Sequence, residues 1–428
     1  MEFDNFMNSI FKRFEFMEKN YKEALPVMCI FGLFMSHTFY RCLRFVFELM
    51  NIQIADNMSF IWFGLLFLAI IVYIRYCFQP LKLLLLIGSY VFYIVNYCIS
   101  SPEARQYYTH GDVMTVLLIY IPICVLMVNK NNKWEILFQN RFFIVSTDAL
   151  IILSFLAKYT YSDHSDYMSF SYDLLPAWNI VMISAIYYNK KIQWLFLVIG
   201  LLEGFIFGAR GPILWFAVCM FLISFYIINN KKKTAKHIIV LIISILGLYI
   251  FIDIIIPFLM NSTFLSSSYV LKRINFGSLT DNSDRKYLYV FCRDIISNMG
   301  INVYGLFYDR TVLPSGMYAH NFIYEILLSF GWFFGTIIIG IISILTIKAF
   351  MNNERIEKRI IATFFICSFF LRYIVSGSIF DEGNFIIYIT VLSTCFSSSK
   401  NCSDKNLCEE CNLISKTCYS EAKSNGCN

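Results

Sequence analysis

The sequence predicts an all-α protein: a polytopic bundle of about 12 transmembrane helices with one long extracytoplasmic loop that contains a short amphipathic helix. The first supporting observation is the apolar composition, since 58% of the residues are hydrophobic and the mean hydropathy is +0.61. Only 15% are charged, against about 25% in soluble domains. The third observation is spacing, because the apolar residues fall into repeated runs of about 20, enough to cross the hydrocarbon core of a bilayer.

The runs follow one another closely, so we expect a single integral-membrane domain over 1–397 and a separate tail over 398–428. The Phe and Tyr residues, 44 and 28 in number, suit the interfacial belts of a membrane protein. The net charge of +6 is spread over short connections between runs, which argues against a nucleic-acid partner. The expected spans cover approximately 24–46, 58–78, 81–99, 113–129, 142–158, 172–189, 191–208, 211–229, 237–259, 318–347, 359–377 and 383–397.

The distribution of Lys and Arg sets the orientation of these spans, because cytoplasmic connections carry an excess of both. With the N-terminus placed inside, most Lys and Arg fall in cytoplasmic segments, and the alternation holds at every short connection. An even number of spans with both ends in the cytoplasm follows from this pattern.

The connection at about 260–317 is the only long one, and loops of this length are usually functional or disordered. Ser283 or Asp284 provides a helix N-cap, and the helix is expected to run to about 298–300. It would place Leu288 and Phe291 on an apolar face that suits a membrane surface.

Arg210 is the first candidate for chemistry, in the sequence Gly-Ala-Arg-Gly-Pro at 208–212, between two expected spans on the outer side. The glycines allow a ligand to approach the backbone closely. Pro212 suits the first turn of the next helix, whose N-terminus adds free N–H groups beside the guanidinium. The turn therefore predicts an anion site; the alternative is an Arg that reaches lipid headgroups.

Arg285 is a second anion-binding candidate at the start of the loop helix, and Arg293 is a weaker one two turns further on. Arg41 and Arg44 lie near the outer end of the first span, and Arg372 lies near the outer end of the eleventh. These three are expected to line the same substrate-binding site, although Arg44 has an alternative partner in Glu48 at i+4.

His320 lies in Tyr-Ala-His-Asn at 318–321, where a long apolar run begins on the outer side. A helix N-terminus disfavours the imidazolium form, so the ring is expected to be neutral and able to accept a proton from a substrate hydroxyl. Tyr318 and Asn321 flank it as substrate-binding candidates, and Glu325 one turn deeper either orients the ring or packs in the bundle. The alternative for His320 is an interfacial side chain bonded to water.

The tail contains five of the 14 cysteines, and Cys408 and Cys411 have CxxC spacing. The surrounding spacing matches no standard zinc finger, so we expect reduced thiols in a disordered tail and no metal site.

Several of these features together resemble the Wzy-type O-antigen and capsule repeat-unit polymerases, within the superfamily that also contains the O-antigen ligases. They are Arg210 in its G-x-R-G turn, the long outer loop with Ser283 and Arg285, and the His320-Asn321 pair followed by Gly331 and Gly335. The G-x3-G spacing of the two glycines differs from the usual ligase pattern and favours a polymerase.

The resemblance implies a GT-C-like membrane fold and a metal-independent inverting glycosyltransferase without cofactors. Such an enzyme joins undecaprenyl-pyrophosphate-linked oligosaccharides on the outer face of the bacterial cytoplasmic membrane. It implies that Arg210 and Arg285 hold the diphosphate and that His320 is the base. Whether a chain-length regulator protein binds is left open.

Two other functions compete with the polymerase. An O-antigen ligase has the same chemistry and a different acceptor. A lipid-linked saccharide flippase or other transporter needs polar residues along a path through the midplane. The gathering of basic residues at one face of the expected bundle favours an enzyme.

Overall fold

The computed structural model describes residues 24–52, 63–71, 79–129, 132–160, 167–229, 283–351 and 355–395. Within these ranges the regular structure is helical, without a strand, as the composition predicts. The expected span at 237–259, most of that at 58–78, the first part of the long loop and the tail lie outside the described residues. The side chains of Arg210, Ser283 and Asp284 also lie outside them.

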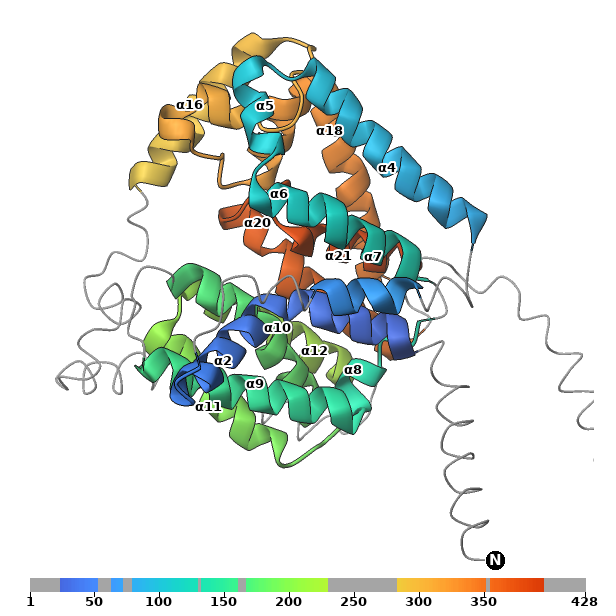
Figure 1. Ribbon diagram of the computed structural model, residues 1–428, viewed down its shortest axis with the longest axis vertical. Coiled ribbons are helices and arrows are strands. Elements are labelled where there is room, and N and C mark those ends of the chain that lie inside the picture. The colour runs from blue at the N-terminus through green and yellow to red at the C-terminus, as the bar shows by residue number, and fades with distance from the viewer. Residues whose placement is uncertain are drawn as a thin grey trace, which may run out of the picture.

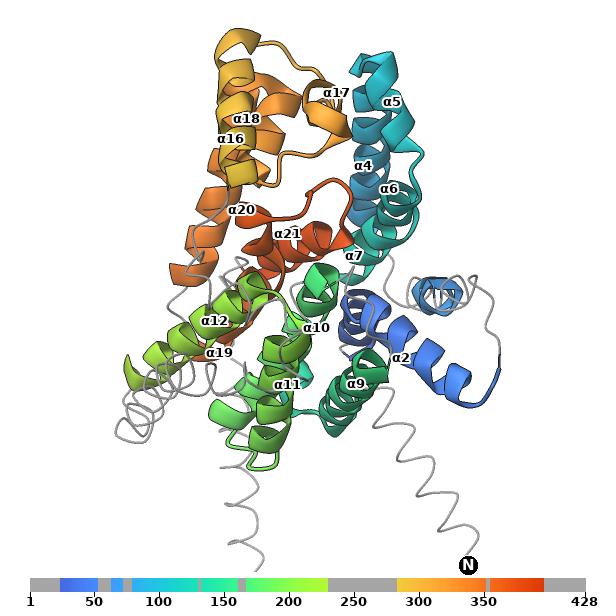
Figure 2. The same ribbon diagram turned by 90° about the vertical axis from the view of Figure 1, so that its left-hand side faces the viewer.

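The helices form two groups joined by a middle layer (Figures 1 and 2). One group contains α2 (Ser36–Leu49), α8 (Ile136–Gln139), α9 (Arg141–Thr160), α10 (Tyr167–Ile186), α11 (Gln193–Phe207) and α12 (Arg210–Asn229). The other contains α4 (Pro80–Ile99), α5 (Pro102–Tyr108), α16 (Ser283–Met299), α17 (Asp309–Val312), the 3-10 turn η4 (Pro314–Gly316) and α18 (Phe322–Met351). Between them run α6 (Gly111–Thr115), η1 (Val116–Tyr120), α7 (Ile121–Met127), η5 (Ile366–Phe370), α20 (Arg372–Val375) and α21 (Gly383–Cys395). The helix α19 (Ile356–Phe365), which leads into η5, lies beside α12 of the first group (Figure 2).

Close packing in the first group depends on small residues of α11. A Cβ on Gly200 or Gly204 would lie 2.7 Å or 2.9 Å from the indole of Trp178, so α11 presses its glycine face onto this ring of α10. Small residues are the usual means by which membrane helices approach one another. Trp178 is fully buried as a result.

Length and composition mark three of the described helices as able to cross a membrane: Pro80–Ile99, Gly211–Asn229 and Phe322–Met351. The bent pair Pro102–Tyr108 and Gly111–Met127 passes the same test together, and Ala24–Phe34, Gln193–Phe207 and Gly383–Thr394 are shorter apolar helices. Only 6% of the apolar window of α4 is buried inside the protein, which suits a helix surrounded by lipid. The structure is thus compatible with a membrane protein, and the number of about 12 crossings stays a prediction.

The helix expected near the start of the described loop segment is present as α16, Ser283–Met299. Its apolar face does not lie free, because Leu288 and Cys292 are buried against Leu313, Ala319 and Leu328. The amphipathic pattern therefore serves packing on α18 and on the chain that leads into it, rather than contact with a membrane surface along this stripe.

The helix α18 is broken inside its apolar run at Gly331, where the backbone has φ 72° and ψ 171°. The Ser329 carbonyl accepts hydrogen bonds from the N–H groups of Tyr304 and Gly305 at 2.9 and 3.0 Å. The break leaves the Ser329 carbonyl without its partner in the helix, and the loop that contains Tyr304 and Gly305 donates hydrogen bonds to it instead. A backbone carbonyl in apolar surroundings requires such a partner. This contact fixes the segment 302–308 beside α18 and so positions α17.

Candidate functional site

His320 occupies the turn that precedes α18, with its backbone in the left-handed region at φ 53°. This region is uncommon for residues other than glycine, and strained backbone often accompanies functional sites. The neighbouring Asn321 holds the turn in place. Its Oδ1 accepts from the Ile323 N–H at 2.9 Å, and its Nδ2 donates to the Ile374 carbonyl at 2.8 Å. Asn321, expected to bind substrate, therefore caps α18 and ties it to α20.

Arg285 reaches the same place from α16. Its Nη1 donates to the Val375 carbonyl at 2.8 Å, which anchors α16 to the end of α20. The Tyr289 hydroxyl, one turn along, donates to the His320 carbonyl at 3.4 Å. The charge of Arg285 acts on the His320 ring, so these two sequence-predicted residues are brought together.

The His320 ring is kept neutral by its surroundings. Burial lowers the pKa of the imidazole to about 4, and the positive charge of Arg285 adds to the effect. The N-terminus of α18, which the sequence argument invoked, is not among these causes. Nδ1 is buried and has no hydrogen-bond partner in the part of the chain that the structure describes. The centre of the His320 ring lies 4.0 Å from the centre of the Tyr318 ring, so the two rings are in contact.

The turn that carries Arg210 is held against α10. The Ala209 N–H donates to the Ser171 hydroxyl at 2.8 Å. A Cβ on Gly211 would lie 2.4 Å from the Tyr172 hydroxyl, so only glycine leaves room for this ring. The Arg372 guanidinium lies 4.6 Å from the centre of the same ring, and the charge of Arg285 also acts on the Tyr172 hydroxyl. Tyr172 thus joins the Arg210 turn to Arg285 and Arg372.

Arg372 and Arg41 line one side of this arrangement, each with an acidic partner. Arg372 Nη2 lies 2.8 Å from Glu382 Oε1, and Arg41 Nη2 lies 3.4 Å from Asp173 Oδ2. The charge of Asp173 also acts on Arg372. Asp173 therefore links Arg41 to the cluster of Arg285, Arg372 and the Arg210 turn.

Two of the sequence-predicted residues do not join this group. Arg44 is exposed and pairs with Glu48 at 2.8 Å, the i+4 alternative that the sequence analysis named. Arg293 is exposed on α16, where its Nε donates to the Tyr289 carbonyl at 3.4 Å.

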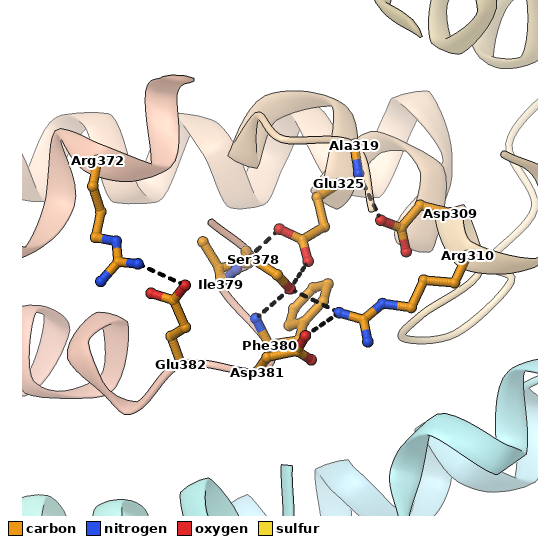
Figure 3. A network of polar contacts seen from close by, with 10 residues as sticks. All are labelled: Asp309, Arg310, Ala319, Glu325, Arg372, Ser378, Ile379, Phe380, Asp381 and Glu382. Carbon is orange, nitrogen blue, oxygen red and sulfur yellow. Dashed lines mark hydrogen bonds and ion pairs between the residues drawn. The ribbon is translucent and has the colours of Figure 1, made fainter. Parts of the chain in front are cut away.

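The structure adds a polar network that sequence reasoning missed (Figure 3). Arg310 of α17 donates from Nη2 to the Ser378 hydroxyl at 3.2 Å and forms an ion pair with Asp381. Ser378 in turn donates to a carboxylate oxygen of Glu325, whose other oxygen accepts from the Ile379 N–H at 3.0 Å. Asp309 accepts from the Ala319 N–H at 3.0 Å. The loop between α20 and α21 is thereby held to α17 and α18.

The acidic groups of this network are hard to ionise because they are buried. Burial raises the pKa of Asp309 to about 6, against the opposing influence of Arg310. Burial also raises the pKa of Asp381, with Arg310 opposing, and of Glu382, with Arg372 opposing. A signal for these residues existed in the sequence, since Asp381-Glu382 interrupts two apolar runs, but such a pair also suits a solvated turn.

The described residues contain no group of three or more His, Cys, Asp or Glu side chains placed to hold a metal ion. The chemistry that the observed arrangement supports is anion binding by guanidinium groups beside a neutral imidazole. Comparisons with protein-family models, with curated proteins and with solved structures found no match to this chain.

Proposed function

We propose that this protein is a glycosyltransferase that polymerises oligosaccharide repeat units carried on undecaprenyl pyrophosphate, in the manner of the Wzy-type family that its motifs resemble. The observation that carries the proposal is the convergence on one place of Arg285, His320, Arg372 and the turn that bears Arg210. These groups come from four separate elements. A scaffold protein has no need for this combination, whereas transfer from a lipid diphosphate uses each part of it.

In the proposed reaction the arginines bind the diphosphate of the donor. Their charge-assisted hydrogen bonds stabilise the negative charge that develops on the leaving oxygen. A hydroxyl oxygen of the acceptor saccharide attacks the anomeric carbon of the donor as the bond to the phosphate oxygen breaks. The acceptor proton passes to the His320 imidazole, and undecaprenyl pyrophosphate departs. Inversion at the anomeric carbon follows from this single in-line displacement.

The burial of His320 beside Arg285 fits a base that acts only after the donor has bound. In the free protein the imidazole is neutral but weakly basic, because its pKa is lowered to about 4 by burial and by the neighbouring guanidinium. A bound diphosphate would offset the positive charge of Arg285, and the basicity of the ring would rise.

The finer topology belongs to the same proposal. It comprises about 12 crossings in a GT-C-like bundle, both termini in the cytoplasm and the reacting groups on the outer face of the bacterial cytoplasmic membrane. The apolar helices and the positive-inside pattern of the sequence support this arrangement.

The experiment that tests the function is a deletion strain whose surface polysaccharide is separated by gel electrophoresis. A polymerase predicts that single repeat units remain and the ladder of longer chains is lost. Polymer that is made but not transferred to lipid A core would indicate a ligase instead. Loss of all repeat units from the outer face would favour a flippase, and an unchanged ladder would refute every one of these functions.

A further inference from the structure

The arginines of the proposed diphosphate site are not equally available to an anion. Arg285 donates to a neutral backbone carbonyl, that of Val375. The Nη2 atom of Arg372 instead lies 2.8 Å from Oε1 of Glu382, so a carboxylate of the same chain already matches its charge (Figure 3). A negatively charged ligand therefore has to compete with Glu382 for Arg372.

The contact between Arg372 and Glu382 uses one point of a guanidinium that can offer more. Arginine frequently binds a carboxylate or a phosphate through two parallel hydrogen bonds. In the described part of the chain only Nη2 of Arg372 bonds to the carboxylate, and Nε is buried without a partner. The guanidinium also lies over the ring of Tyr172, 4.6 Å from its centre. Arg372 thus has a support that does not depend on Glu382, and a ligand with several anionic oxygens can bind it at more points than Glu382 does.

Glu382 likewise has a second partner. The Tyr373 hydroxyl donates a hydrogen bond to the Glu382 carboxylate, and Tyr373 is fully buried. A Cβ on Gly377 would lie 3.0 Å from Glu382 Oε1 and 3.3 Å from the Tyr373 ring, and the backbone there has φ 82°. Glycine at this position therefore leaves room for the carboxylate beside Tyr373. The carboxylate can leave the guanidinium and still keep a hydrogen bond.

The ion pair is open to solvent on the side of the carboxylate. The exposed fraction is 27% for the Glu382 side chain and 10% for the Arg372 side chain. The neighbouring side chains of Arg41 and Asp173 are 27% and 14% exposed. An anion that arrives from solvent therefore reaches Glu382 first and must displace it to bind Arg372.

The proposed reaction changes the charge that the arginines hold. The donor diphosphate is esterified at both ends and carries about two negative charges. When the bond to the anomeric carbon breaks, its electron pair stays on the phosphate oxygen, so the leaving undecaprenyl pyrophosphate carries about three at neutral pH. Guanidinium groups bind the more highly charged product more tightly, and its release would then limit the rate of turnover.

We propose that Glu382 is an internal counter-ion, which yields Arg372 to the bound diphosphate, takes it back afterwards and so promotes release of undecaprenyl pyrophosphate. This inference rests on the proposed function and names a residue that regulates its diphosphate site. Glu382 acts through Arg372, so it is a positioning residue. Tyr373 holds the carboxylate while Arg372 binds the ligand.

Binding of geranyl diphosphate to the purified full chain in detergent tests this inference, measured by isothermal titration calorimetry. Geranyl diphosphate is a soluble monoester with the charge of the proposed product. Glu382→Gln keeps the size of the side chain and removes its charge, so it is expected to tighten binding by about five- to tenfold. A damaged fold would weaken binding, so the direction of the change separates competition from misfolding.

Three further variants trace the origin of that gain. Adding Arg372→Gln to Glu382→Gln is expected to abolish it, because no guanidinium is left to be released. Asp381→Asn removes the adjacent charge, which pairs with Arg310 instead, and is not expected to tighten binding. Tyr373→Phe is expected to weaken binding, because the displaced carboxylate then lacks its second partner.

The inference fails on any of three results. One is an affinity of Glu382→Gln or Tyr373→Phe equal to that of the unaltered protein. Another is a gain in Asp381→Asn as large as that in Glu382→Gln. The third is the absence of geranyl diphosphate binding in both the unaltered protein and Glu382→Gln.

The outcome is distinguishable from failure of the proposed function. If the deletion strain loses its long chains but Glu382→Gln binds geranyl diphosphate no more tightly, the polymerase stands and the counter-ion role is wrong. If Glu382→Gln binds more tightly but the ladder is unchanged in that strain, Glu382 regulates a diphosphate site that serves another reaction.

Discussion

At the scale of single residues, the chemistry of His320 depends on two neighbours that the sequence does not place beside it. The ring is buried, and Arg285 comes from a helix more than 30 positions earlier. Sequence reasoning found the residue and its neutral state, and it attributed that state to the start of a helix. The actual causes are burial and a guanidinium, both of which depend on tertiary packing.

A titration measures this effect directly. The imidazole of His320 is expected to titrate near pH 4 in the free protein, followed by NMR of histidine-labelled protein and assigned with His320→Gln. In Arg285→Gln the pKa is expected to rise yet to stay below 6.5, because burial is the larger cause and remains. The sign follows from removing a positive charge, which makes the imidazolium less unfavourable. Titration of the unaltered protein near 6.5 would contradict this account.

The low pKa of His320 also affects stability. An unfolded chain binds a proton at this histidine near pH 6.5, whereas the folded chain does so only near pH 4. The unfolded state therefore holds more protons between these values, and the contribution of His320 to stability falls as the pH is lowered through this window. His320→Gln removes this dependence, so its thermal-unfolding midpoint should change less between pH 6.5 and 4.5 than that of the unaltered protein.

At the scale of elements, apolar runs and turn residues predicted most helix positions. The loop helix was expected from Ser283 or Asp284 to about 298–300 and is observed over Ser283–Met299. Internal irregularities were not predicted, among them the break of α18 at Gly331 and the π-helical segments Val116–Tyr120 and Ile366–Phe370. These depend on partners from distant parts of the chain, which hydrophobic periodicity does not encode.

The break at Gly331 provides a test with a matched control on the same helix. A Cβ there would lie 2.4 Å from the Asn302 carbonyl oxygen, and the backbone has a conformation that only glycine adopts readily. Gly331→Ala is expected to destabilise the protein by roughly 1–3 kcal/mol, seen as a lower thermal-unfolding midpoint in detergent. Gly340→Ala, where nothing lies within 4 Å of the added atom, should be neutral or stabilising. Equal midpoints for the two variants would exclude this role of the break.

At the scale of the whole molecule, the sequence indicated which segments carry chemistry but not which charges meet. Arg285 and His320 stood out because each lies at a helix start beside a recognisable motif. Arg310, Asp381 and Ser378 did not, because charged and hydroxyl residues in loops are usually solvated. Only the fold pairs Arg310 with Asp381 across 71 positions. The same fold shows Arg44 and Arg293 facing outward.

The proposed orientation of the chain in its membrane is open to chemical labelling. Cys98 is exposed and the five tail cysteines are expected to be free thiols, so replacing these six residues with serine lowers the background, while the other described cysteines are buried. In that background Asp294→Cys is expected to react with a membrane-impermeant maleimide in intact cells. Lys191→Cys, in a connection that the positive-inside pattern places in the cytoplasm, should react only after permeabilisation. The reverse pattern would invert the topology and move the candidate site to the wrong side.

The central claim is that Arg285 and His320 act together on a lipid diphosphate and an incoming sugar. The most direct measurement is the ladder of surface polysaccharide in the deletion strain complemented with Arg285→Ala, with His320→Ala or with Lys286→Ala, at matched amounts of protein in the membrane. Lys286 is an exposed cation next to Arg285 on α16 and serves as the matched control. We predict that the first two variants yield only single repeat units and that the third restores the full ladder. Full ladders from Arg285→Ala and His320→Ala would contradict the account.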